Sequence, residues 1–270
     1  MSSITIGTSG FSFDDWKGTV YPHNLKKEEW LSYYERELGF KALEVNFTYY
    51  TLPSPRTLEG MSRKTSLDFS FVVKAFRGMT HDIQDTGSTT YSNNKKTFEQ
   101  FVIALQPLID ARKLACVLAQ FPYSFQPSDT TYDYLERFKE LLGPLPLTIE
   151  FRNRKWLTAK TVQFLKYHAL GYCAVDEPRL PQLMPFYPAA TSAIGYFRFH
   201  GRNTSWFNVP TSVRYDYLYS TAQIKEFITP ITFVASKTEK VFAFFNNCHA
   251  GSAVRNAAML IRMIQEKEQL

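Results

Sequence analysis

The sequence contains few cysteines and no long apolar segment. Its three cysteines, Cys116, Cys173 and Cys248, form no C-x-x-C pair. An odd count at these spacings predicts neither a disulfide framework nor a zinc knuckle. No apolar run is long enough to cross a bilayer, and the N-terminal stretch MSSITIGTSG lacks a charged segment followed by an apolar one. We therefore expect no secretory signal, no membrane partner and a cytoplasmic protein.

Charge of one sign is nowhere concentrated. Lys and Arg total 31 against 25 for Asp and Glu, which gives a net charge of +6. This mild excess favours anionic partners, but the chain has no basic run of the kind that forms a nucleic-acid-binding tail. The motifs G-x-G-x-x-G, G-x-x-x-x-G-K-[ST], G-x-S-x-G and H-E-x-x-H are also missing. Function must therefore be inferred from dispersed side chains.

Short apolar runs rich in β-branched and aromatic residues recur along the whole chain. They predict eight strands, which begin at Ile4, Ala42, Phe69, Ala115, Leu147, Gly171, Ile194 and Val241. Amphipathic stretches predict helices over residues 26–38, 54–63, 94–111, 129–142, 158–169, 221–229 and 252–267. Alternating strands and helices form a parallel sheet. Eight such units fit an α/β fold, a (β/α)8 TIM-barrel-like closed parallel barrel with a single domain over residues 1–270; an open doubly wound sheet is the alternative.

Two connections depart from this alternation. Residues 178–192 carry four prolines where the sixth helix would stand, and because proline disrupts helix interiors we expect a loop. Residues 201–220 form a second long segment rich in aromatic side chains. Long loops in compact domains often act as lids or binding loops, so this segment is expected to lie near a site.

Polar side chains share one face of several predicted strands. In YFRFH, Tyr196, Arg198 and His200 share a face opposite Phe197 and Phe199, because alternate residues of a strand point the same way. The apolar face must pack against the helices, so the polar face points to the barrel axis. We expect the charges near the C-terminal ends of the strands to line the catalytic mouth; these are Glu44, Lys74, Glu150, Arg152, Asp176, Arg198 and His200.

The first interpretation of these charged side chains is that they catalyse acid–base chemistry. The catalytic candidates are Glu44, Glu150, Asp176 and His200, since neighbouring charges can separate the pKa values of such groups. Glu150 or Glu44 would act as the base, and His200 as the acid or proton shuttle. The structural alternative is a buried ion-pair network that fills the barrel, because buried charges must be paired.

The second interpretation is that basic and amide side chains at the barrel mouth bind an anion. The candidate substrate- or anion-binding residues are Lys74, Arg152, Arg198, Gly201, Arg202, Asn246 and Asn247. Arginine binds phosphate or carboxylate through two parallel N–H groups, and barrels often hold phosphate in the loops after strands seven and eight. In the alternative, Arg152 pairs with Glu44 or Glu150, and Arg198 pairs with Asp176; the two roles can coexist.

No cofactor is evident from the sequence. Glu44, His81, Glu150, Asp176 and His200 are residue types that could ligate a divalent metal. Their spacing follows no known metal motif, and nearby arginines would repel a cation. A divalent metal therefore remains an alternative, with no ligand set assigned.

The motifs together resemble the YecE-like family, catalogued as domain of unknown function 72. The matching stretches, spread over nearly the whole chain, are GTSG at 7–10, Trp16, EVN at 44–46, VVKA at 72–75, His81, QFP at 120–122, EFR at 150–152, Trp156, Asp176, RFHGR at 198–202 and FNN at 245–247. The resemblance implies a TIM-barrel-like fold and a site, but no reaction. This chain departs from the pattern at Asn153, where such sequences usually carry a histidine, so a role for that histidine does not transfer.

Three hypotheses for function follow. The first is an enzyme, a hydrolase or another acid–base catalyst, that acts on a phosphorylated or otherwise anionic small molecule. The second is a nucleic-acid-binding barrel or a metal-dependent, nuclease-like phosphodiesterase, whose affinity would fall steeply with salt. The third is a non-catalytic ligand-binding protein. The sequence predicts no oligomeric state.

Overall fold

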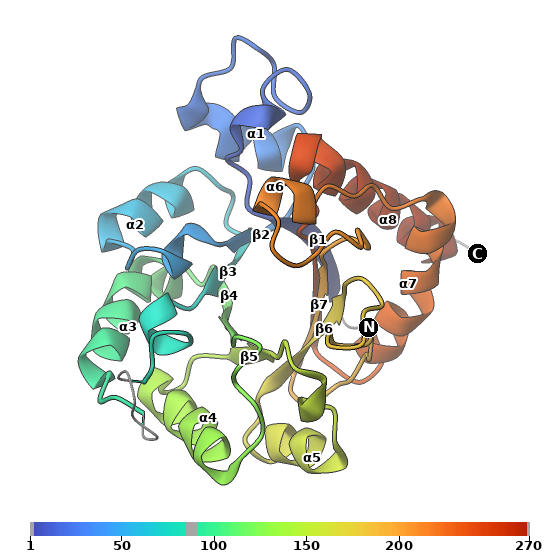
Figure 1. Ribbon diagram of the computed structural model, residues 1–270. Coiled ribbons are helices and arrows are strands. Elements are labelled where there is room, and N and C mark those ends of the chain that lie inside the picture. The colour runs from blue at the N-terminus through green and yellow to red at the C-terminus, as the bar shows by residue number, and fades with distance from the viewer. Residues whose placement is uncertain (1–2, 85–90, 269–270) are drawn as a thin grey trace.

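The computed structural model describes residues 3–84 and 91–268 and contains a closed parallel barrel (Figure 1). Neighbouring strands follow chain order, and β1 pairs with β8 to close the barrel. The strands are β1 Ser3–Ser9, β2 Ala42–Val45, β3 Ser70–Lys74, β4 Leu114–Gln120, β5 Leu147–Glu150, β6 Gly171–Asp176, β7 Ile194–Phe199 and β8 Lys240–Phe245. The TIM-barrel-like prediction is confirmed, and the open doubly wound alternative is wrong.

Helices surround the barrel (Figure 1). They are α1 Trp30–Arg36, α2 Pro55–Arg63, α3 Lys95–Asp110, α4 Asp129–Leu142, α5 Ala159–Tyr167, α6 Thr211–Arg214, α7 Thr221–Ala235 and α8 Ser252–Glu268. Several begin directly after a Ser or Thr whose side-chain oxygen accepts a backbone N–H of the first turn; these caps are Ser54, Ser128, Thr158 and Ser220. Local capping therefore fixes where the outer helices start.

The helix boundaries differ most from the sequence prediction in two places. The stretch 26–38 begins with the 3-10 turn Lys27–Glu29, and only Trp30–Arg36 is α-helical. Helix α7 continues through Pro230 to Ala235 although proline disfavours helix interiors. Ile231 and Val234 beyond the proline are buried, so their packing offsets the lost backbone hydrogen bond.

The two irregular connections lie as the sequence predicts, with one addition. Within residues 178–192 the structure contains no helix. The 201–220 segment contains the short helix α6, which lies over the barrel opening near β1 and β2 (Figure 1). This long loop therefore covers part of the C-terminal mouth of the barrel.

The alternation of strand faces is also confirmed. Phe199 points outward, and its ring lies 4.3 Å from that of Phe227 on α7. Arg198 points inward and reaches Glu44 on β2, which is not a neighbour of β7 in the sheet. A contact between non-adjacent strands has to cross the interior, so the polar face of β7 does line the barrel axis.

The structure also describes the state of the cysteines and the character of the helices. Cys116, Cys173 and Cys248 are free and buried. No helix in the described ranges 3–84 and 91–268 combines the length and apolarity needed to cross a membrane.

Candidate functional site

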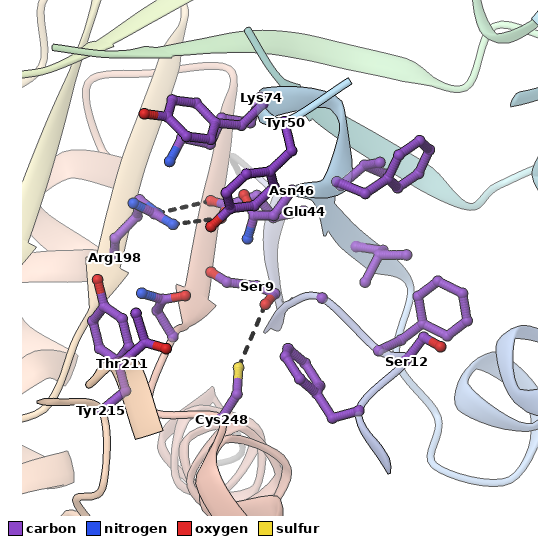
Figure 2. A pocket seen from close by; sticks show the side chains of 18 of the residues that line it. Ser9, Ser12, Glu44, Asn46, Tyr50, Lys74, Arg198, Thr211, Tyr215 and Cys248 are labelled. Atoms are coloured by element: carbon purple, nitrogen blue, oxygen red, sulfur yellow. Dashed lines mark hydrogen bonds and ion pairs between the residues drawn. The ribbon is translucent and has the colours of Figure 1, made fainter. Parts of the chain in front are cut away.

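A cavity of about 720 Å³ opens at the C-terminal ends of the strands. Figure 2 shows Glu44, Lys74 and Arg198 on its polar side. The other polar lining residues include Ser9, Asn46, Gln120, Arg152 and Asn246. Aromatic side chains form much of the wall, namely Phe11, Phe13, Phe47, Tyr49, Tyr50 and Tyr215. A mostly apolar wall with a few convergent polar groups is typical of small-molecule sites.

Arg198 lies at the centre of the polar floor. Its Nε and Nη2 donate to the two oxygens of Glu44 at 2.9 and 2.7 Å, and its Nη1 donates to Glu150 Oε2 at 2.6 Å (Figure 2 shows the Glu44 bonds). The Tyr196 hydroxyl donates to Glu44 Oε2 at 2.7 Å. Arg198 is 2% exposed and both carboxylates are fully buried. Such a buried pair persists only because its hydrogen bonds replace the lost hydration.

Arg152 extends this network toward the next strand. Its Nε lies 2.7 Å from Glu150 Oε1, and its Nη1 donates to Glu177 Oε2 at 2.9 Å. The two neighbouring arginines hold the pKa of Glu150 well below its ordinary value, despite the opposing effect of burial. Burial raises the pKa of Glu177 to about 7, with Arg152 acting against it. Glu150 is therefore a weak base, and Glu177 is the carboxyl group nearest to titration at neutral pH.

Lys74 differs from the two arginines in its partners. Its Nζ donates to Gln120 Oε1 at 2.9 Å and lies 4.5 Å from the centre of the Tyr49 ring. No carboxylate of the described ranges lies within ion-pair distance of Lys74. Burial, with the nearby positive charge of Arg198, lowers its pKa from 10.5 to about 7. At neutral pH a substantial fraction of Lys74 is therefore an uncharged amine.

His200 lies behind the cavity rather than on its surface. It is fully buried, and the Asn246 side-chain amide donates to its Nδ1 at 2.9 Å. Its Nε2, which then carries the proton, lies 3.6 Å from Glu150 Oε1. Burial first, and Arg152 second, lower the pKa of His200 to about 3, so the ring is neutral at physiological pH.

Asp176, Gly201 and Arg202 lie together away from the cavity lining. Arg202 binds Asp176 through three N···O contacts of 2.9 to 3.2 Å, and the Tyr219 hydroxyl donates to Asp176 Oδ2 at 2.7 Å. The Gly201 N–H donates to the Tyr219 hydroxyl at 2.8 Å. The guanidinium of Arg202 also lies 5.5 Å from the ring of Phe227 on α7. This cluster joins the end of β7 to the outer layer.

The strand register explains that placement. Val175 pairs with Arg198, and paired residues of neighbouring strands share a face. Val175 therefore faces the barrel axis, Asp176 faces outward and Glu177 faces inward again toward Arg152. The predicted pairing of Arg198 with Asp176 is wrong for this reason, whereas the pairing of Arg152 with Glu150 is confirmed.

The same alternation separates Asn246 from Asn247. Asn246 lines the cavity because Phe244, two residues earlier, pairs with the inward-facing Arg198. Asn247 is fully buried and donates to Asn256 Oδ1 of α8 at 2.9 Å. Of the predicted anion-binding set, the cavity thus brings together Lys74, Arg152, Arg198 and Asn246, and leaves out Gly201, Arg202 and Asn247.

Several lining groups were not predicted as site residues. Ser9 Oγ and Asn46 Oδ1 are buried atoms without a hydrogen-bond partner in the described structure, and both residues line the cavity (Figure 2). Buried polar atoms are normally paired, so these two are open to a ligand or to ordered water. The sequence signal for these residues is that Ser9 and Asn46 lie at the polar ends of strands, as Gln120 does at the end of β4.

The donor set does not favour a metal ion. No group of three or more His, Cys, Asp or Glu side chains suited to a metal occurs in ranges 3–84 and 91–268. Glu44 and Glu150 are bound by arginines, and His81 packs against the Tyr49 ring with a centroid distance of 4.9 Å. The residues named as potential metal ligands are therefore held by other partners.

Nearly the whole chain is similar to one family of known proteins. A family model described as protein of unknown function DUF72 matches residues 5–270. The UPF0759 protein YunF of Bacillus subtilis (strain 168) is 28% identical over 273 residues, covering 97% of this chain and 94% of YunF.

Two solved structures agree with this match. The crystal structure of a DUF72 family protein from Thermotoga maritima MSB8 has a TM-score of 0.90 and 42% identity, covering 97% of this chain and 99% of that one. A DUF72 family protein from Enterococcus faecalis V583 has a TM-score of 0.85 and 26% identity, covering 97% and 95% respectively. These descriptions name a family, but no activity.

Proposed function

The chain belongs to the DUF72 family of proteins of unknown function, and from its cavity we propose an enzyme that binds a small anionic substrate and transfers protons through Lys74. The observation that carries the proposal is the difference among three cations of the cavity floor. Arg152 and Arg198 are each paired with two carboxylates. Lys74 has only the neutral Gln120 as a hydrogen-bond partner among the described residues.

The arginines support anion binding even though they are paired. A guanidinium has five N–H donors, and Arg198 directs one from each nitrogen to Glu44 or Glu150. This leaves one N–H on each terminal nitrogen, and Arg198 and Arg152 both line the cavity. The unpartnered Ser9 Oγ is a further donor. A carboxylate or phosphate could thus be held without breaking the ion pairs.

In this proposal Glu44 and Glu150 position the two arginines and do not transfer protons themselves. Glu44 and Glu150 fix the two guanidinium planes through short bonds. The depressed pKa of Glu150 makes it a poor proton acceptor at neutral pH. His200 stays neutral with a pKa of about 3 and does not line the cavity. Lys74, whose pKa is about 7, is better matched to general acid–base work.

The first test is ligand binding by thermal shift. We expect inorganic phosphate, sulfate and small dicarboxylates to raise the melting temperature of the wild-type protein, because they bind the folded state. Lys74→Met should reduce this increase. Lys225→Met, which removes the same charge from an exposed position on α7, is the matched control and should behave as wild type.

Other outcomes of this test point elsewhere. Equal shifts in all three proteins would locate the anion away from Lys74 and contradict the proposal. A shift with short single-stranded RNA or DNA alone, falling steeply with salt, would favour the nucleic-acid hypothesis. A shift with a divalent metal, reversed by a chelator, would favour the metal-dependent one. Anion binding without turnover of phosphate esters, oxo acids or other anionic substrates would leave a ligand-binding protein.

A further inference from the structure

Lys113 and Lys74 are both shielded from solvent to some degree, and their surroundings differ. Lys113 is 4% exposed, and its Nζ donates to Ser62 O, Thr65 O and Thr65 Oγ1 at 2.6, 2.9 and 3.1 Å. Its three ammonium hydrogens therefore each have an acceptor. Lys74 has one acceptor, Gln120 Oε1, and its half-buried side chain lines the cavity. Burial lowers the pKa of Lys113 as well, but its three acceptors suit the ammonium form, whereas Lys74 can lose a proton and keep its one hydrogen bond.

We infer that Lys74 is a nucleophile that forms a Schiff base with a carbonyl compound bearing an acid group, either a small 2-oxo acid or a phosphorylated ketone or aldehyde. This inference rests on the proposed function and narrows it to a substrate class. The acid group would bind the remaining N–H donors of Arg152 and Arg198. The carbonyl carbon would then lie within the same cavity as Nζ.

The step balances without a further reactant. The lone pair of the uncharged Nζ adds to the carbonyl carbon, and one amine proton passes to the oxygen to give a carbinolamine. The C–O bond then breaks, and the oxygen leaves as water with the second amine proton, so that a C=N bond remains. No oxidant or reductant is consumed. Protonation of this imine makes the neighbouring C–H and C–C bonds easier to break, which is the general use of lysine in covalent catalysis.

The electrostatic surroundings favour the uncharged amine. The charged and titratable groups around Lys74 come from several strands and from the loops after β2 and β3, and they are Glu44, Tyr49, His81, Glu150, Arg152 and Arg198. Burial is the largest cause that lowers the pKa of Lys74, and the positive charges of Arg198 and Arg152 add to it. Glu150 and Glu44 raise the pKa, but both are bound by arginines, and the net result is a pKa of about 7. Schiff-base formation should therefore increase as the pH rises through 7.

Reductive trapping tests the inference directly. Wild-type protein would be incubated with pyruvate or dihydroxyacetone phosphate and sodium cyanoborohydride, followed by intact mass measurement and peptide mapping. We expect one adduct, located on Lys74. Hydroxyacetone, which has the carbonyl but no acid group, should give about tenfold less, because it lacks a charge-assisted hydrogen bond. Lys74→Met should give no specific adduct, and Lys225→Met should react as wild type.

The outcomes separate this inference from the proposed function. Adducts spread over surface lysines, or located on Lys113, would overturn the Schiff-base assignment, and mapping on the wild type does so even if Lys74→Met fails to fold. Anion-induced thermal shifts that depend on Lys74, with no adduct from either probe, would also overturn it while leaving the proposed function intact. The absence of both the shifts and the adduct would overturn both.

Discussion

Arg198 on β7 crosses the barrel to hold both oxygens of Glu44 on β2, at 2.9 and 2.7 Å. The same guanidinium holds Glu150 on β5 at 2.6 Å. These strands are far apart in the chain, so the three side chains fix the polar floor of the cavity from separate directions. The network fills the barrel, which is the structural role that the sequence analysis gives as the alternative. The proposed anion-binding role does not require these ion pairs to break, because each guanidinium has five N–H donors.

Removing one partner of this pair should destabilise the protein strongly. Arg198→Met leaves Glu44 buried with only the Tyr196 hydroxyl. We expect the free energy of unfolding to fall by about 3–5 kcal/mol, as measured by urea denaturation. Glu44→Leu should have a similar effect. The double variant should lose clearly less than the sum of the two, because it leaves no unpaired charge at Glu44; additive losses would contradict the direct pairing.

The pKa of Lys74 should respond to the residue that accepts its hydrogen bond. Gln120→Glu places a carboxylate next to Nζ, which should raise the pKa of Lys74 toward its ordinary value of 10.5. Trapping of pyruvate at pH 7 should then fall by about tenfold or more if the pKa rises by more than one unit, since each unit of pKa well above the pH reduces the free amine tenfold. Gln120→Met adds no charge and is the matched control; equal losses in both variants would indicate a packing effect instead.

Ser9 should matter for ligands rather than for folding. Its Oγ is buried without a hydrogen-bond partner in the described structure, so Ser9→Ala removes no protein hydrogen bond. We expect the free energy of unfolding to stay within about 0.5 kcal/mol of wild type. Phosphate affinity, measured by calorimetry, should fall by roughly fivefold for a lost hydrogen bond of about 1 kcal/mol. A large stability loss with unchanged affinity would assign Ser9 a structural role.

Gly201 should behave as a structural residue. Its φ of +92° lies in the left-handed region, and a Cβ there would lie 2.6 Å from Tyr217 Cβ. Gly201→Ala should cost about 1–3 kcal/mol beyond the strain of the backbone conformation. Gly39 also has a positive φ, of +75°, but a Cβ there would meet no atom within 4 Å, so Gly39→Ala measures the strain alone. Equal losses in the two variants by thermal denaturation would contradict the close contact.

His200 should make stability depend on acid pH. Its pKa is about 3 in the folded protein against an ordinary value of 6.5, so between these values the unfolded chain binds a proton that the folded protein does not. Stability should therefore rise with pH from about 3 to 6.5. His200→Gln lacks this slope, so the difference in unfolding free energy between wild type and variant should grow over this range. Glu177 has a raised pKa of about 7, so its contribution to the unfolding free energy falls as the pH rises. This contribution is the same in both proteins and cancels in the comparison. A difference between wild type and variant that stays constant with pH would contradict a buried, neutral His200 ring.

The barrel could be predicted from the sequence because its signals are local and repeated. Eight apolar runs, the helices between them and the alternation in YFRFH define a closed sheet with a polar interior. The sequence GYCAVDEP has no charged residue before Asp176 to show which face is inward. Asp176 was therefore expected in the mouth, whereas the register turns Glu177 inward. A shift of one residue reverses every side chain of a strand, and only the pairing with β7 reveals it.

The site residues could be predicted only where a well-defined strand sets the direction of each side chain. Lys74, Glu44 and Arg198 follow from alternation on well-defined strands. Arg202 does not, because β7 ends at Phe199 and the turn at Gly201 directs the following chain toward α7. The sequence does not reveal that Lys74 has no ionic partner in the described structure. That feature depends on which strands bring each arginine and each carboxylate to the barrel interior.

The measurement that tests the central claim most directly is the pKa of Lys74 itself. Competitive acylation of the native protein over a range of pH, with the Lys74 peptide quantified by mass spectrometry, gives that value from the pH at which labelling is half-maximal. A midpoint near 7 is the predicted result. A midpoint near the ordinary value of 10.5 would show that Lys74 is an ordinary ammonium ion and would contradict both its proposed catalytic role and its proposed nucleophilic one.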